Sequence, residues 1–177
     1  MKRISVFLLA GAALLALALP LTSAGAATTA SACGLDKVWI KVSTQTDLAE
    51  IQAGNAVLQV SKNAAVRRLA TRTRADHTAA YAQAKTLAAK YRLRVATAPS
   101  PTQVWEFNAV AGLRNRQRAF NIAYASNQVA GHLQAIDLAN TEVSAGCAAG
   151  VEANAKTALP MLRMHLALAR AALRASR

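Results

Sequence analysis

Residues 63–91 read NAAVRRLATRTRADHTAAYAQAKTLAAKY, and this stretch decides the fold. Small and apolar residues recur there at steps of three and four, from Val66 through His77 to Tyr91. That spacing is typical of one face of an α-helix. Alanine is the strongest helix former, and Asn63 is a typical N-cap residue. The stretch therefore predicts one long helix over residues 64–91.

The same spacing recurs along the chain, without the alternation of apolar and polar residues that marks a half-buried strand. The long helices are predicted at residues 36–60, 64–91, 115–145 and 149–175. The inner side of the first is predicted to hold Leu48, Ile51, Gly54, Val57 and Leu58. Residues 38–42 could also form a short strand, and Pro160 is expected to kink the last helix. A short helix over residues 103–111, capped by Thr102, follows two prolines. The predicted fold class is an all-α four-helix bundle.

The connection over residues 92–113 decides how the long helices are arranged. Short turns join the first two helices and the last two, so each pair is an antiparallel hairpin. The connection between the pairs can span roughly 48 Å, which matches a helix of roughly 42 Å. In a simple up-and-down bundle Cys33 and Cys147 would lie a helix length apart, whereas a crossover brings them together. A disulfide and a long crossover between helices two and three are therefore expected together, in the ferritin-like arrangement.

The N-terminus predicts an exported protein. Residues 1–26 combine a positive start, an apolar core and a small-residue cleavage site, as a signal peptide does. An uncleaved N-terminal anchor is the alternative. Residues 27–35 are expected to form a flexible lead-in, and residues 36–177 the ferritin-like four-helix domain. The expected location is the periplasm or the exterior of the cell. Within the envelope, association with the outer membrane is also consistent with this expectation. In such an oxidising compartment two cysteines favour the disulfide, with lipidation of Cys33 as the alternative.

The chain is strongly basic, with 21 Lys and Arg against 8 Asp and Glu and a net charge of +13. Such a surface favours anionic partners, and in an exported protein these are envelope lipid or acidic polymer rather than nucleic acid. The alternative is a solvated basic surface without a dedicated partner. No feature of the sequence favours a particular oligomeric state.

The three histidines of the chain fall on the inner faces of three different predicted helices. Counted at about 1.5 Å per residue, His77, His132 and His165 all lie near the middle of the bundle, as does Glu50 on the first helix. Asp76 precedes His77 and is expected to orient its ring. Polar side chains that converge at one level of an apolar core are how helix bundles build metal sites.

Three imidazoles and one carboxylate suit zinc, copper, nickel or iron more than calcium or magnesium. The alternative is a buried hydrogen-bond network in which the histidines are purely structural. The chain has no phosphate-binding glycine loop, no Cys-x-x-Cys, no Gly-x-Ser-x-Gly and no His-Glu-x-x-His. The absence of these motifs argues against an enzyme.

Three segments resemble an exported bacterial family, the domain of unknown function 4142, which is labelled "predicted outer membrane protein" and placed among ferritin-like folds. They are residues 47–54 (DLAEIQAG), 66–77 (VRRLATRTRADH) and 158–169 (ALPMLRMHLALA). The resemblance covers residues 38–172 and implies a ferritin-like four-helix fold and an exported location. The motif positions that it implies are Glu50, Asp76, His77, His132 and His165.

The resemblance implies no activity, because the family has none assigned. Ferritin-like di-iron proteins carry Glu-x-x-His on two helices, and this chain has no such motif. We therefore expect neither ferroxidase chemistry nor iron storage. The two functions that the sequence supports are transition-metal handling or stress protection through the histidines, and binding of anionic lipid or polymer through the basic surface.

Overall fold

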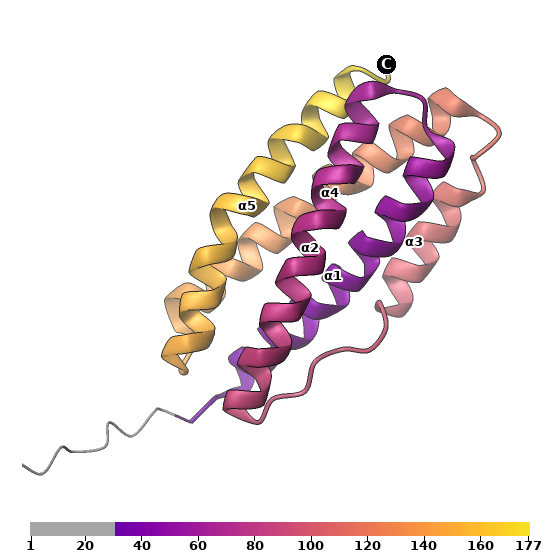
Figure 1. The fold of residues 1–177 in the computed structure, drawn as a ribbon. Helices are drawn as coiled ribbons and strands as arrows, with labels where there is room; N and C mark the ends of the chain where they lie inside the picture. The colour runs from indigo at the N-terminus through magenta and orange to yellow at the C-terminus, as the bar shows by residue number, and fades with distance from the viewer. Residues whose placement is uncertain (1–30) are drawn as a thin grey trace, which may run out of the picture.

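The computed structural model describes residues 31–177 of the chain. The predicted signal peptide, residues 1–26, and residues 27–30 of the predicted lead-in lie outside the described residues. Within 31–177 the secondary structure is entirely helical, which confirms the predicted fold class (Figure 1). The helices are α1 (Gly34–Val60), α2 (Ala64–Tyr91), α3 (Pro101–Ala111), α4 (Gln117–Ala145) and α5 (Ala149–Arg174). None of them is long and apolar enough to cross a membrane.

The bounds of α2 are those predicted, and hydrogen bonds at its start explain why. The Asn63 side chain accepts from the backbone N–H groups of Ala65 and Val66, at 3.0 and 3.2 Å, and so satisfies two donors that a helix start leaves free. At the other end Arg92 adopts the left-handed conformation, with φ of 55°, and closes the helix.

Three local predictions were wrong, and the alternative of a strand over residues 38–42 is excluded, because these residues are part of α1. The first correction is that α1 begins at Gly34 rather than at residue 36. The cap of α3 is Ser100, not Thr102, because the side chains of Ser100 and Gln103 each accept the other's backbone N–H, at 3.3 and 2.8 Å. The intervening Pro101 lacks an N–H and fits the first helical position. The helix predicted from residue 115 begins at Gln117.

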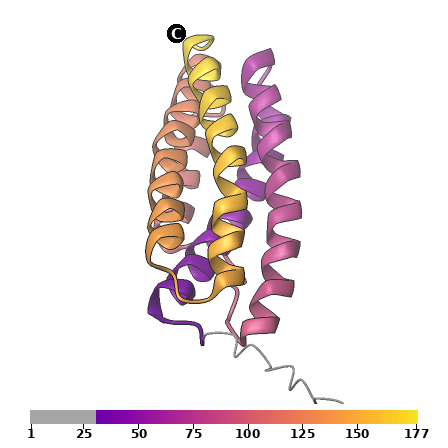
Figure 2. The same ribbon diagram turned by 90° about the vertical axis from the view of Figure 1, so that its left-hand side faces the viewer.

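The predicted crossover is confirmed by contacts at both ends of the bundle. At one end α4 starts beside the α1–α2 turn, where the Gln117 side chain donates to the carbonyl of Val60 at 3.0 Å. At the other end α2 finishes beside the start of α5, where the Gly150 N–H donates to the Tyr91 hydroxyl at 3.1 Å. The connection runs back along the bundle between these ends and carries α3, which packs on α1 and α4 (Figures 1 and 2).

The predicted disulfide joins Cys33 to Cys147, with Cα atoms 5.7 Å apart. Asp36 lies beside it and accepts the backbone N–H groups of Cys33 at 2.6 Å, Ala148 at 3.1 Å and Cys147 at 3.3 Å. One carboxylate therefore caps the start of α1 and also holds the α4–α5 connection. The disulfide and this carboxylate tie two segments that are 114 residues apart in the sequence.

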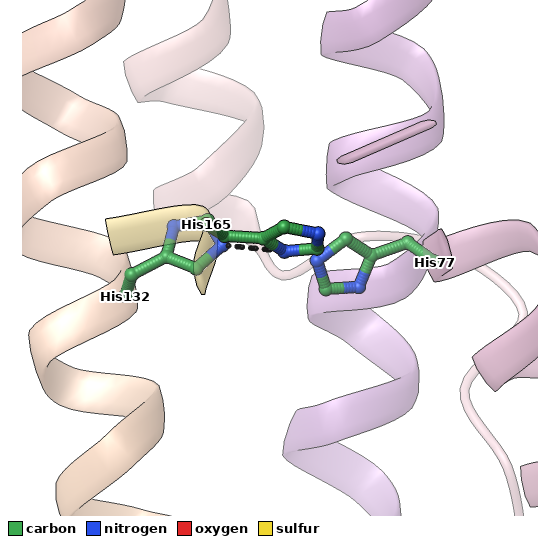
Figure 3. A group of neighbouring side chains, drawn as sticks. All are labelled: His77, His132 and His165. Atoms are coloured by element: carbon green, nitrogen blue, oxygen red, sulfur yellow. Dashed lines mark hydrogen bonds between the residues drawn. The ribbon is translucent and has the colours of Figure 1, made fainter. Parts of the chain in front are cut away.

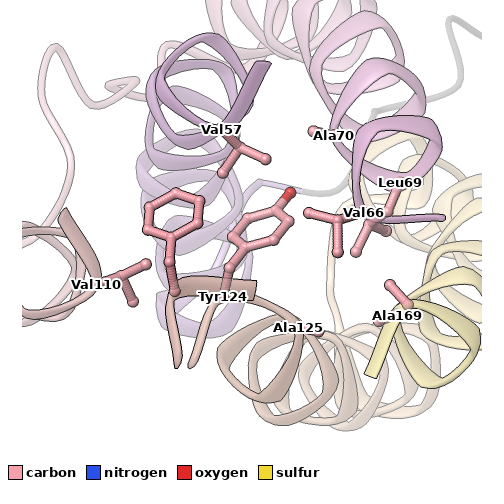
Figure 4. Packing of buried hydrophobic residues seen from close by; sticks show 10 residues of the cluster. Val57, Val66, Leu69, Ala70, Val110, Tyr124, Ala125 and Ala169 are labelled. Atoms are coloured by element: carbon pink, nitrogen blue, oxygen red, sulfur yellow. The ribbon is translucent and has the colours of Figure 1, made fainter. Parts of the chain in front are cut away.

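Two apolar clusters fill the ends of the bundle. The first includes Val57, Leu69, Phe120 and Tyr124 and lies toward the α1–α2 turn (Figure 4). The second lies toward the disulfide and consists of Trp39, Ile40, Ala88, Ala139, Ala148, Val151, Ala155, Leu159 and Leu162. Between the clusters, all four long helices place buried polar side chains. These are Thr44, Asp47 and Glu50 on α1, Thr73 and His77 on α2, Gln128 and His132 on α4, and His165 on α5.

Candidate metal centre

The three histidines meet in this polar layer, and all are buried: His77 and His132 are 2% exposed and His165 is 0% exposed. The centroid of the His165 ring is 5.2 Å from that of His132 and 5.3 Å from that of His77. The centroids of His77 and His132 are 6.1 Å apart. Figure 3 shows the rings approaching one another from α2, α4 and α5. The structure thus brings together the three histidines that the sequence placed at one level.

Each ring uses one nitrogen to hold an oxygen on the outer side of the cluster. His77 Nδ1 is 2.7 Å from Asp47 Oδ1, His132 Nδ1 is 2.8 Å from the Gln128 carbonyl, and His165 Nε2 is 2.8 Å from Asp76 Oδ2. A carbonyl or carboxylate oxygen can only accept, so the ring nitrogen is the donor in each pair. These three contacts assign the N–H of each neutral imidazole to its outer side.

The remaining nitrogens face one another: Nε2 of His77, Nε2 of His132 and Nδ1 of His165. All three lie within 4.8 Å of one another. His132 Nε2 and His165 Nδ1 are 3.2 Å apart, and His77 Nε2 has no hydrogen-bond partner. If each ring is neutral, three lone pairs converge without a donor among them. Such an arrangement suits a positive charge at its centre, either a proton or a metal ion.

The surroundings of the three rings shift their pKa values in different directions, so the rings differ in how readily they take up a proton. Burial opposes a charge on His77, but the hydrogen bond with Asp47 and the negative charges of Glu50 and Asp76 outweigh it and raise the pKa of His77. Burial lowers the pKa of His132, and it lowers the pKa of His165 to about 4 despite the hydrogen bond with Asp76. At neutral pH, His132 and His165 are therefore neutral, the state in which imidazole binds a metal.

Glu50 lies next to the cluster but is not part of the three-nitrogen group. The Gln128 amide donates to both oxygens of its carboxylate, at 2.8 and 2.9 Å. The same residue therefore supports the centre twice, because its backbone carbonyl accepts from His132. The Glu50 carboxylate occupies the α1 side of the layer, where the sequence placed it, with Gln128 as its partner.

The predicted partner of His77 was wrong. Asp76 binds His165 on α5, and the oxygen that holds His77 belongs to Asp47 on α1. Adjacent residues on a helix point about 100° apart, so Asp76 and His77 reach different neighbours. Asp76 also accepts from Arg72 at 2.6 Å. These two donors outweigh the effect of burial and lower the pKa of Asp76, which keeps its carboxylate charged.

Two residues that contact the candidate centre, Asp47 and Gln128, were not predicted from the sequence. The spacing of the sequence could have indicated both residues. Asp47 lies three residues before Glu50, and Gln128 lies four residues before His132. Residues at these distances share a helix face. Hydrophobicity alone does not identify them, because both are polar residues at buried positions, 5% and 6% exposed.

A cavity of about 920 Å³ opens beside the centre. His77, His132 and Glu50 line it, whereas His165 does not. A metal ion held by the three inner nitrogens would have three protein ligands and would lie beside this cavity. Three protein ligands and one free position are typical of sites that exchange or activate a ligand, whereas structural zinc sites are closed by four protein ligands.

Fold and centre together define an all-helical bundle with a long crossover and a polar middle layer, the arrangement of ferritin-like proteins. The family model described as "Domain of unknown function (DUF4142)" matches residues 20–172, and the chain belongs to this family. This confirms the resemblance found in the sequence.

A similar fold occurs in a solved structure, "Crystal structure of DUF305 fragment from Deinococcus radiodurans". The two chains are 14% identical with a TM-score of 0.67, and the match covers 81% of this chain and 98% of the other. This likeness concerns the fold alone. Among curated proteins, none matches the chain.

Proposed function

We propose that this protein binds one transition-metal ion through His77 Nε2, His132 Nε2 and His165 Nδ1. The observation that carries the proposal is the orientation of the rings: each directs its N–H outward to a fixed oxygen and its lone pair toward the other two. Carboxylates and carbonyls that hold the far nitrogen of a metal-binding histidine are typical of metal sites, because they fix the tautomer and the ring plane. A purely structural network would instead pair the inner nitrogens with donors.

The ligand set favours zinc, copper, nickel or iron over the oxygen-preferring calcium and magnesium. Ligand bonds of about 2.0–2.1 Å to three nitrogens need only small ring movements from the present spacing. Glu50 could complete the shell by leaving Gln128, or a ligand from the cavity could do so. Metal handling or stress protection in the cell envelope, after export by the N-terminal signal, is the role that we propose for the site.

The direct test is the metal content and affinity of the untagged full chain after export and signal removal. The three histidines are the only ones in the sequence, so an untagged protein has no competing imidazole. We expect about one metal ion per chain by elemental analysis, and loss of binding in His77→Gln, His132→Gln and His165→Gln. Asp137→Asn, an exposed change on α4, is the matched control. Substoichiometric metal, or metal retained in all three histidine variants, would contradict the proposal.

The charge distribution supports a second proposal, binding of anionic envelope lipid or polymer. Among the described residues, Arg72 is the one lysine or arginine that lines the cavity, so the positive charge lies on the outer surface. Sedimentation with anionic vesicles tests this function. We expect salt-sensitive binding that survives replacement of all three histidines, and no binding to neutral vesicles; equal binding to both kinds of vesicle would contradict it.

A further inference from the structure

The cavity is much larger than a metal site requires. One water molecule occupies about 30 Å³ in the liquid, whereas the cavity measures about 920 Å³, within the range of small-molecule binding sites. Small side chains leave this space at the middle of the bundle, where larger apolar residues would fill it. The small residues that line the cavity include Ala49, Ala53, Ala56, Ala80, Gly131 and Ala135.

The charge of the lining selects the kind of ligand. Four of the eight acidic residues of the chain line the cavity, namely Asp47, Glu50, Asp76 and Glu106. Apart from His77 and His132, Arg72 is the one basic residue of the lining within the described part of the chain, and it is paired with Asp76. The net charge of the protein is +13, yet carboxylates outnumber lysine and arginine side chains in the cavity lining. The cavity therefore favours a cation and repels an anion.

Three buried side chains that line the cavity carry hydrogen-bond acceptors, namely Glu50, Tyr124 and Gln128. Gln128 Oε1 and the Tyr124 hydroxyl accept no hydrogen bond from the described residues. The hydroxyl of Thr73 lies beside that of Tyr124 but donates to the carbonyl of Ala70, at 3.4 Å, so the lone pairs of Tyr124 stay free to accept. Tyr124 and Gln128 are one turn apart on α4, and Gln128 holds Glu50, which makes no salt bridge within residues 31–177.

We propose that the cavity binds a small organic primary ammonium compound. Its –NH₃⁺ group donates its three hydrogens to Glu50, Gln128 Oε1 and the Tyr124 hydroxyl, and its aliphatic part lies along the alanine-lined wall. An alkylammonium group has three donors and no acceptor, which complements this set of acceptors. The cavity borders the metal centre, because His77, His132 and Glu50 line it. His165 does not line the cavity, so replacement of His165 separates metal binding from ammonium binding.

The test is calorimetry on metal-free protein with three probes of equal chain length: hexylamine, hexanoate and hexyltrimethylammonium. We expect saturable binding of one hexylamine per chain, with hexanoate and the quaternary ammonium weaker by about tenfold or more, because one has the wrong charge and the other has no N–H. Equal binding of hexanoate would overturn the charge argument. Equal binding of the quaternary compound would overturn the three-acceptor assignment.

Variants locate the ammonium group. Glu50→Gln and Tyr124→Phe should each weaken hexylamine binding, by about tenfold and about threefold. Glu106→Gln, which removes a carboxylate from the same lining, is the matched control and should change the affinity by less than about threefold. Gly131→Leu should abolish binding, because a Cβ at Gly131 meets no atom within 4 Å and its side chain can grow into the open space. Thermal unfolding by circular dichroism verifies that each variant is folded, and unchanged affinity in both Glu50→Gln and Tyr124→Phe would overturn the proposal.

The metal proposal and the ammonium proposal fail in different ways. His165→Gln should remove metal binding and leave hexylamine binding intact. Loss of both in this variant, with the fold unchanged, would contradict a separate ammonium site. If wild-type protein binds metal but no hexylamine, the ammonium proposal alone is wrong.

Discussion

Glu142 on α4 offers a test of the electrostatics near the disulfide. Its side chain is fully buried, and neither carboxylate oxygen has a hydrogen-bond partner among the described residues. Burial, together with the nearby carboxylate of Asp36, raises the pKa of Glu142 from 4.5 to about 7. Below that pH the carboxyl group is neutral, whereas above it two carboxylates lie close together.

The consequence for stability follows from the proton count. Between pH 4.5 and about 7 the folded state holds a proton on Glu142 that the unfolded state has lost, so the free energy of unfolding falls as the pH rises. Above about pH 7 the group is ionised in both states, and the full cost is present. At about 1.4 kcal/mol per pH unit over about 2.5 units, this cost is at most about 3.5 kcal/mol.

Glu142→Gln removes the charge and keeps the size of the side chain. We expect the variant to match wild type within about 1 kcal/mol at pH 5 and to be more stable by about 2–3 kcal/mol at pH 8. Urea unfolding of the oxidised proteins at both pH values gives these differences. Asp137→Asn, an exposed change on the same helix, should show no such pH dependence. If Glu142→Gln and wild type differ by the same amount at pH 5 and pH 8, the assigned titration is wrong.

Three further changes test other parts of the structure. Replacing Cys33 and Cys147 together by Ser should lower the free energy of unfolding by about 3–5 kcal/mol in urea, because the bond closes a loop of 114 residues; an unchanged midpoint would refute this. Gly54→Ala should destabilise by about 1–3 kcal/mol despite the gain in helix propensity, since its Cβ would lie 2.8 Å from a side chain and 3.1 Å from a carbonyl of α2; greater stability in the same assay would contradict that packing. Asp47→Asn should weaken metal affinity by about 10–100-fold in competition titrations, because Asp47 orients His77; an unchanged affinity would show that the contact has no such role.

The topology could be predicted because two independent features of the sequence agree. Helical periodicity and the length of the connection allow a crossover, and Cys33 and Cys147 can pair only if it exists. Caps are harder to assign, as Ser100 and Thr102 illustrate. Both residues are good caps by type, and only the reciprocal bonds with Gln103 distinguish them.

The orientation of α1 could not be predicted from hydrophobicity. Leu48 and Ile51 were expected on its inner side, and both are only half buried, whereas Asp47 and Glu50 face inward. Rules of periodicity place apolar residues inside, so they fail where a helix faces a polar site. This failure is itself informative, because it marks the level of α1 at which the candidate centre lies.

The level of the histidines along the bundle followed from counting residues, but their partners did not. Rise per residue fixes the height of a side chain, whereas the direction of each ring depends on small rotations of four helices. Asp47 therefore holds the ring that Asp76 was expected to orient, and Asp76 holds His165 instead. Only the packed structure decides which carboxylate reaches which ring.

The polar layer lies where an ordinary four-helix bundle would continue its apolar core. Buried polar groups that lack partners cost about 1–3 kcal/mol each, and this layer leaves His77 Nε2, Tyr124 Oη and Gln128 Oε1 without one. The apolar clusters at the two ends and the disulfide must therefore stabilise the fold while the middle remains unsatisfied. A cation that binds only the folded state reverses that balance, and at a free concentration 100 times its dissociation constant it adds about 2.7 kcal/mol. The same layer that weakens the isolated bundle would thus make its stability respond to a bound cation.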